Sequence, residues 1–230
     1  MRFVLLSLLT IGTLSAQLKE YKPSRFNLFS KDQDVQLGKE SADEVRKTMP
    51  MVNNKDLVDY MNRIGQKLAA SKRAGGFPYT FEVINDPTIN AFALPGGPTF
   101  IYTGLLDKLK TEDELAGIMG HELTHVRKEH WAYAYRDQQQ HQLGLTVLLM
   151  IFHANNNVAN IASISDSLIF SLPFSRKHES EADDGGLTMM TGAGYNPQGM
   201  VDAFKLLQSF SGSKNPPGGL SDHPSDSRRI

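Results

Sequence analysis

The chain has 230 residues, of which 40% are hydrophobic, so it is long enough to bury a sizeable core as one domain. Its 24 basic and 25 acidic residues leave a formal charge of -1, which gives no broad basic surface for a nucleic-acid partner. The absence of cysteine excludes disulfides, thiolate metal sites and cysteine nucleophiles. Any metal ligands must therefore come from the 7 histidines and the carboxylates.

Residues 1–16 have the features of a secretory signal peptide: a positive start, a mostly apolar stretch to Leu14, and small residues before Gln17. The apolar stretch is shorter than the about 20 residues that a membrane-spanning helix needs. An uncleaved anchor is the alternative, because Leu14 is not a small residue at the third position before the cut. We expect a periplasmic protein, rather than a secreted or membrane-associated one, with its mature domain at 17–230.

The first part of the mature chain predicts two helices followed by three short strands. Apolar residues at helical spacing predict helices from Asp34 to near Pro50 and from Lys55 to about Ser71. The period then changes, and strands are predicted at 79–84, 90–94 and 99–103. We therefore expect an α+β domain that is mainly helical and contains a small three-stranded sheet with antiparallel pairing.

Three further helices are predicted in the second half of the chain. Thr111–Glu114 matches a capping box, and the helix that it opens is expected to continue to at least Arg127. Another helix is predicted from about Arg176 to Thr191. The last begins at Asn196-Pro197, a capping residue followed by proline at the first helical position.

Leu143 to Phe152 is an unbroken apolar run. As a helix it would be roughly 15 Å long, about half of a bilayer core. We interpret it as a buried helix, and the alternative is peripheral membrane association through 143–152.

The strongest functional signal is the sequence His121-Glu122-Leu123-Thr124-His125. Residues four apart on a helix share a face, so both imidazoles point the same way and suit a tetrahedral zinc ion. Glu122 falls near that face and can act as general base on a metal-bound water without binding the metal. The alternative is a helix with surface histidines, but the apolar stripe through the motif would bury them and leave them in need of partners.

Two histidines leave a hydrolytic zinc site incomplete, because such a site keeps three protein ligands and one open position. Glu179 and Glu181, on another predicted helix, can each supply the third ligand, although Glu181 points away from the face that Glu179 shares with Asp183. Asp183 is placed to orient a ligand histidine, and Arg176 to neutralise the acidic cluster. The alternative is a solvated acidic helix face.

The other histidines are predicted to lie outside the site. His130 and His141 occur among polar residues and are interpreted as ordinary surface groups. His178 adjoins Glu179 but points off its face.

A resemblance to a known family is carried by the His-Glu-x-x-His motif together with Ser175-Arg176-x-x-Glu179-x-Glu181-Ala182-Asp183-x-x-Gly186. Both motifs resemble the CAAX-prenyl-protease-like (Ste24/HtpX-type) zinc metallopeptidases, and most closely their soluble periplasmic BepA/LoiP-like branch. The similarity covers nearly the whole mature chain: it includes Gly38-Lys39-Glu40, 90–97, His223-Pro224 and 228–230.

The resemblance implies a gluzincin-type fold and one zinc ion. It also implies that Glu179 is the third ligand and Asp183 a supporting residue. It places His223 near the metal, either as a donor that assists catalysis or as a plug in the open position.

We therefore expect a zinc-dependent endopeptidase. Its substrate is expected to pair with a candidate edge strand formed by Asn90, Ala91, Phe92 and Ala93, which favours unfolded or misassembled envelope proteins and a role in protein quality control. The alternative is a latent protease, plugged by His223, that acts mainly as a chaperone or assembly factor. The oligomeric state does not follow from the sequence.

Overall fold

The computed structural model describes residues 29–142 and 174–211. The predicted signal peptide, the apolar run 143–152 and His223 lie outside the described residues. In chain order the described elements are α1 (Lys31–Thr48), α2 (Lys55–Ala69), the short 3-10 helix η1 (Lys72–Ala74), β1 (Thr80–Ile84), β2 (Ala91–Ala93), β3 (Pro98–Tyr102), α3 (Thr103–Leu106), α4 (Glu112–Arg127), α5 (His130–Gln142), α8 (Arg176–Gly192) and α9 (Gln198–Ser211). None of these described helices has the length and apolar character needed to cross a bilayer.

The predicted α+β class with a small three-stranded sheet is confirmed, and the helix ends follow from their caps. α1 begins before the predicted Asp34, because Ser30 and Gln33 form a capping box in which each side chain accepts a hydrogen bond from the other's backbone N–H. At the start of α4, the hydroxyl of Thr111 accepts a hydrogen bond from the N–H of Glu114 at 3.2 Å.

The sheet is mixed, so the expected antiparallel pairing is wrong for one pair of strands. The strand order is β1-β3-β2, with β3 antiparallel to β2 but parallel to β1. After β1 the carbonyl of Asp86 accepts hydrogen bonds from the N–H of Gly104 and the hydroxyl of Thr103, both at 2.9 Å. These bonds hold the end of β1 beside the end of β3. The chain therefore returns as β2 on the far side of β3, and a turn at Pro95–Gly97 leads into β3.

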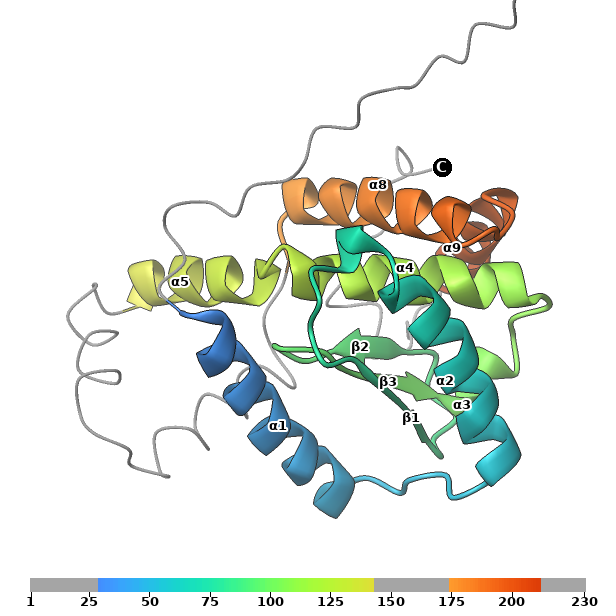
Figure 1. The fold of residues 1–230 in the computed structure, drawn as a ribbon, viewed down its shortest axis with the longest axis horizontal. Coiled ribbons are helices and arrows are strands. Elements are labelled where there is room, and N and C mark those ends of the chain that lie inside the picture. The colour runs from blue at the N-terminus through green and yellow to red at the C-terminus, as the bar shows by residue number, and fades with distance from the viewer. Residues whose placement is uncertain (1–28, 143–173, 212–230) are drawn as a thin grey trace, which may run out of the picture.

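α4 is the central helix of the domain and lies between the sheet and α8 (Figure 1). Every residue from Glu114 to Val126 is buried. The main core surrounds it with apolar side chains from α2, the sheet, α8 and α9, including Ile64, Phe81, Met189 and Met200. A helix that is enclosed on all sides presents polar side chains to its neighbours, and not to water, wherever its sequence carries them.

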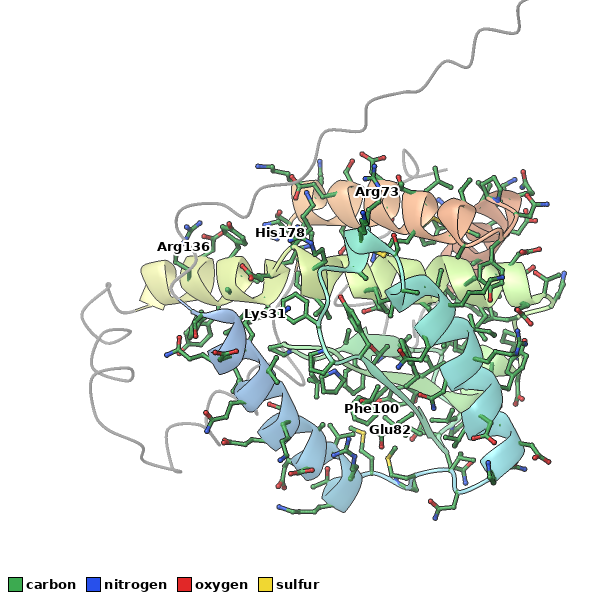
Figure 2. The ribbon with its side chains drawn as sticks, viewed as in Figure 1. Lys31, Arg73, Glu82, Phe100, Arg136 and His178 are labelled. Carbon is green, nitrogen blue, oxygen red and sulfur yellow. The ribbon has the colours of Figure 1, made fainter. Side chains whose placement is uncertain are left out.

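One ion pair and two hydrogen bonds from Lys31 attach α1 to the rest of the domain (Figure 2). At its start, Lys31 Nζ donates to the carbonyls of Gly75 and Gly76, at 3.1 and 2.8 Å. Near its end, Arg46 forms an ion pair with Glu82 of β1 at 2.6 Å. α1 is thereby held at both ends, beside the sheet.

Glycines allow α4 and α8 to approach each other backbone to backbone. A Cβ added to Gly186 would lie 2.6 Å from the backbone nitrogen of His121, and one added to Gly120 would lie 2.9 Å from the carbonyl oxygen of Gly186. A side chain at either position would separate the helices. The close approach sets Glu179 and Asp183, in the first half of α8, against the His-Glu-x-x-His turn of α4.

Asp34 is a buried acid in the first turn of α1, with only 1% of the residue exposed. Burial, together with the negative charge of Glu129, raises the pKa of Asp34 to about 7, against a contribution from the Trp131 indole that lowers it. The folded protein therefore holds a proton on this carboxyl at pH values where the unfolded chain has released it.

Replacing Asp34 with Asn should stabilise the fold selectively at high pH. Because the folded-state pKa lies above the unfolded value of 3.8, native Asp34 costs nothing below about pH 4 and destabilises increasingly as the pH rises to about 7. At 1.36 kcal/mol per pKa unit, the advantage of D34N in unfolding free energy should grow by at most about 4 kcal/mol between about pH 4 and pH 8. Urea unfolding across this range measures it, and an advantage that does not change with pH would contradict the prediction.

Replacing Gly186 with Ala should destabilise the domain by about 1–3 kcal/mol, the usual effect of overpacking a core contact. Gly192→Ala is the matched control, because Gly192 lies in the same helix and its added Cβ would meet nothing within 4 Å. The control should be neutral or slightly stabilising, since alanine favours helix. Denaturant midpoints compare the two variants, and equal midpoints would show that the α4–α8 approach is not a constraint.

Candidate active site

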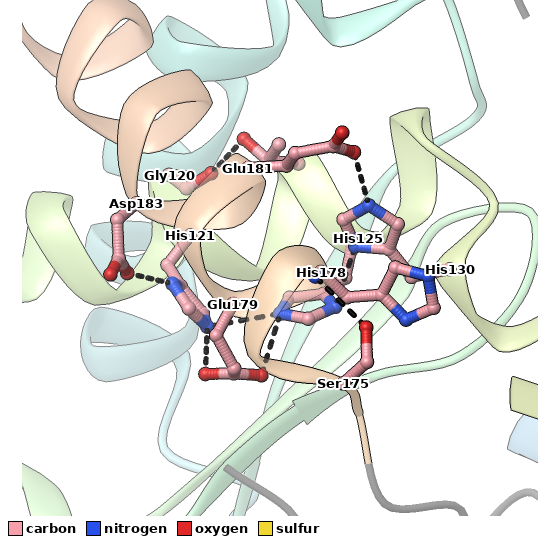
Figure 3. Close-up of polar contacts among 10 residues, drawn as sticks. Gly120, His121, His125, His130, Ser175, His178, Glu179, Glu181 and Asp183 are labelled. Carbon is pink, nitrogen blue, oxygen red and sulfur yellow. Dashed lines mark hydrogen bonds and ion pairs between the residues drawn. The ribbon is translucent and has the colours of Figure 1, made fainter. Parts of the chain in front are cut away.

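Three buried side chains with metal-binding atoms converge where α8 crosses α4 (Figure 3). His121 and His125 come from consecutive turns of α4, and Glu179 comes from the first turn of α8. One ligand atom from each residue lies within 4.8 Å of the others. Exposure is 4%, 4% and 1%, respectively.

The spacing of these atoms fits a single metal ion. The Nε2 atoms of His121 and His125 are 3.0 Å apart, and the Glu179 carboxylate oxygens lie 3.7 Å from the first and 3.5 Å from the second. Two nitrogen ligands at 2.0–2.1 Å from a tetrahedral zinc ion are about 3.3 Å from each other. Imidazole and carboxylate donors also suit zinc among the divalent metals.

Asp183 fixes the direction of the His121 lone pair. Its Oδ1 lies 2.9 Å from His121 Nδ1, and a carboxylate can only accept, so Nδ1 carries the hydrogen and donates it. In a neutral imidazole the lone pair is then on Nε2, the atom that faces His125 and Glu179. The contact has the geometry expected of a residue that orients a metal-binding histidine.

Glu122 and Arg176 differ in their placement. Glu122 follows His121 in α4 and is buried at 4% exposure, as a residue inside the site requires. Its role as a base stays a prediction. Arg176 is exposed at the first residue of α8, and among the described residues it forms no ion pair with the acidic side chains. The expected neutralising contact is absent there, because α8 buries its inner face only from Glu179 onward.

β2, the predicted substrate strand, lies at an edge of the described sheet and is the strand nearest to α4 (Figure 1). It spans Ala91–Ala93 within the predicted Asn90–Leu94. Phe92 stacks on Phe100 of β3, with ring centroids 5.2 Å apart.

The backbone of β2 alternates between β3 and the sheet edge. The carbonyl of Asn90 and the N–H of Leu94 bond to β3 at 3.0 and 2.7 Å. Since bonded pairs recur at every second residue of an antiparallel ladder, the backbone of Phe92 also faces β3. The backbone groups of Ala91 and Ala93 are therefore directed outward.

The interpretation of His130 as a surface group is wrong. His130 is 1% exposed, and its Nδ1 lies 3.1 Å from Nδ1 of His125. Its Nε2 lies 3.2 Å from Oε2 of Glu181, a residue expected to point away from the site. His178, at the start of α8 (Figure 2), stacks on the His130 ring with centroids 4.5 Å apart and an interplanar angle of 16°.

The chain brings His130 back to His125 by a turn that helical periodicity does not reveal. α4 ends at Arg127, and Glu129 adopts a left-handed conformation with φ of 54° before α5 begins at His130. A helix continued through this point would have carried His130 to a different face from His125. The feature of the sequence that could have indicated this contact is a third histidine, five residues after His125.

The pKa shifts of His130 and Glu181 agree with the hydrogen bond between these two residues. Burial, together with nearby His178, lowers the pKa of His130 to about 3. Burial alone would raise the pKa of Glu181, but the hydrogen bond from His130 and the positive charge of Lys128 hold it below its ordinary value. A neutral imidazole thus lies beside an ionised carboxylate at neutral pH.

Comparison with known proteins agrees with the geometry of this site. Residues 56–230 match peptidase family M48. The beta-barrel assembly-enhancing protease of Escherichia coli (strain K12) is 29% identical over 98% of this chain and 50% of its own length. The mitochondrial metalloendopeptidase OMA1 of Schizosaccharomyces pombe is 30% identical over 92% of this chain and 64% of its own length, and that of Saccharomyces cerevisiae is 33% identical over 67% and 46%.

The chain spans about half the length of the Escherichia coli relative. The matched region includes nearly all of α2 and continues through α4 and α8, the two helices that form the site. The resemblance drawn from the motifs is confirmed, and so is the expectation of a metallopeptidase. This chain therefore belongs to peptidase family M48, a family of hydrolases that depend on a bound metal.

Proposed function

We propose that this chain is a zinc-dependent endopeptidase in which His121, His125 and Glu179 hold one zinc ion. The observation that carries the proposal is the convergence of these three buried donors at distances suited to a single ion. Zinc is the metal favoured by two imidazoles and one carboxylate, and three protein ligands leave one position for water or substrate.

Bound zinc supplies Lewis acidity, which acidifies water and polarises a scissile carbonyl. Glu122, next to His121, is the proposed general base: it takes the proton of the attacking water and passes it to the leaving amine. Asp183 holds His121 in the tautomer that presents Nε2 to the cluster. We retain His223 as a residue that either donates to the developing oxyanion or plugs the site.

The position of β2 at the sheet edge supports the proposal that the substrate is an extended, unfolded chain. The outward backbone groups of Ala91 and Ala93 can pair with an added strand, while the side chains contribute little discrimination. A site that binds mainly through the substrate backbone acts on chains without tertiary structure, because folded proteins keep their backbones paired.

We further propose that the protein acts in quality control of envelope proteins in the periplasm, as a mature domain at 17–230. The signal-like residues 1–16 support export. The name of the Escherichia coli relative refers to β-barrel assembly, and spanning β-barrels are typical of bacterial outer membranes.

Glu122→Gln should retain zinc and lose about 100- to 10,000-fold of the cleavage rate, because it removes the proton acceptor and leaves the ligands in place. Glu179→Gln should lose zinc as well as activity. Casein cleavage and metal content of the purified protein measure both, with Glu44→Gln, at a half-exposed side chain of α1, as the control. If native protein, Glu122→Gln and His223→Ala all held zinc and were equally inert, the chaperone alternative would replace the peptidase.

Ala93→Pro should weaken substrate binding without disturbing the sheet. Proline removes the outward N–H of residue 93 but none of the bonds to β3, and edge strands accept it. One lost hydrogen bond of about 0.5–1.5 kcal/mol raises KM for unfolded casein by roughly 2- to 10-fold. Ala93→Val, which keeps the N–H, is the control for side-chain bulk. An unchanged KM in Ala93→Pro would exclude strand pairing at this position.

A further inference from the structure

His130 is a buried polar residue beside the site that the mechanism above does not use. We propose that His130 and Glu181 are positioning residues that fix the tautomer of His125 and so direct its Nε2 lone pair at the metal. The inference rests on the proposed zinc site and concerns how that site is held.

The tautomer follows from counting donors along the chain of contacts (Figure 3). The Glu181 carboxylate can only accept, so the His130 Nε2 that lies 3.2 Å from it carries a hydrogen and donates. A neutral His130 then has its lone pair on Nδ1, which lies 3.1 Å from Nδ1 of His125. His125 must donate across that contact, and its own lone pair is therefore on Nε2, 3.0 Å from Nε2 of His121.

The opposite assignment would disable the site. If His130 donated from Nδ1, His125 would accept there and would carry its hydrogen on Nε2. That hydrogen would point at the lone pair of His121 and at Glu179, and a hydrogen bond would replace a metal ligand. Metal binding through His125 Nε2 thus requires an acceptor at the place of His130 Nδ1.

α8 supports both histidine ligands, by two different routes. Asp183 accepts from His121 directly, at 2.9 Å. Glu181 acts on His125 through His130, whose imidazole lies between them, with Nδ1 3.1 Å from His125 Nδ1 and Nε2 3.2 Å from Glu181 Oε2. α8 thereby contributes one ligand, Glu179, and two residues, Asp183 and Glu181, that orient the other two ligands.

His130 is held in this place by its surroundings. The His178 ring stacks on it, and Lys128 Nζ lies 3.6 Å from the Glu181 oxygen that accepts its hydrogen bond. The left-handed Glu129 immediately before it is an unfavourable conformation for a residue with a side chain. Such a conformation persists where neighbouring contacts determine it, and it is common at functional sites.

His130→Asn and His130→Leu test the proposal as a matched pair. Both lose the stacked ring and the donor to Glu181, but the Asn amide oxygen can occupy the place of Nδ1 and accept from His125, whereas Leu offers no acceptor. Loss of a residue that orients a metal ligand weakens metal affinity by about 10- to 100-fold. We expect a zinc dissociation constant raised by that factor in His130→Leu, and raised by less than about tenfold in His130→Asn.

Competition with a chromogenic chelator on the full chain measures the zinc dissociation constant, and denaturant midpoints of the metal-free variants report folding separately. Glu181→Leu should weaken zinc binding, and Glu181→Gln, which keeps an acceptor for His130, should restore most of it. Equal weakening in His130→Asn and His130→Leu would mean that His130 acts by packing alone and would overturn the proposal.

The same titrations separate this inference from the proposed function. If Glu179→Gln bound zinc as tightly as native protein, the proposed zinc site itself would be wrong. If Glu179→Gln lost zinc while His130→Leu kept native affinity, the zinc site would stand and the role of His130 would fall.

Discussion

The close approach of α4 and α8 is the constraint on which the site depends. Gly120 and Gly186 leave no side chain between the two backbones, so the first half of α8 lies directly against the His-Glu-x-x-His turn. Glu179 and Asp183 can contact the α4 histidines only at this short separation. A few tenths of an ångström matter here, because metal coordination and hydrogen bonds both tolerate little change in distance.

Burial gives the site its chemical character. Glu179 is 1% exposed, and a carboxylate removed from water is costly unless positive charge compensates it. A divalent cation held between Glu179, His121 and His125, as we propose, would supply that charge. The polar groups around the cluster then serve orientation, since each imidazole must keep its Nε2 lone pair toward the ion.

The topology of the sheet places one of its edge strands, β2, beside α4. β3 occupies the centre, so β2 lies at the side of the described sheet that faces α4. The alternation of an antiparallel ladder leaves the backbone of Ala91 and Ala93 directed outward. A group of metal-binding side chains and a strand edge next to one helix together support the proposed hydrolysis of an extended peptide.

The sequence by itself determined what depends on residues close together in the chain. The pairing of His121 with His125, the caps at Thr111 and Asn196, and the strand positions all follow from one helical turn, one cap or one alternation. Only the tertiary structure decided the direction of β1 against β3, which of the two glutamates enters the cluster, and the burial of His130. These features depend on the crossing of helices far apart in the chain and on the left-handed turn at Glu129, and periodicity carries no information about either.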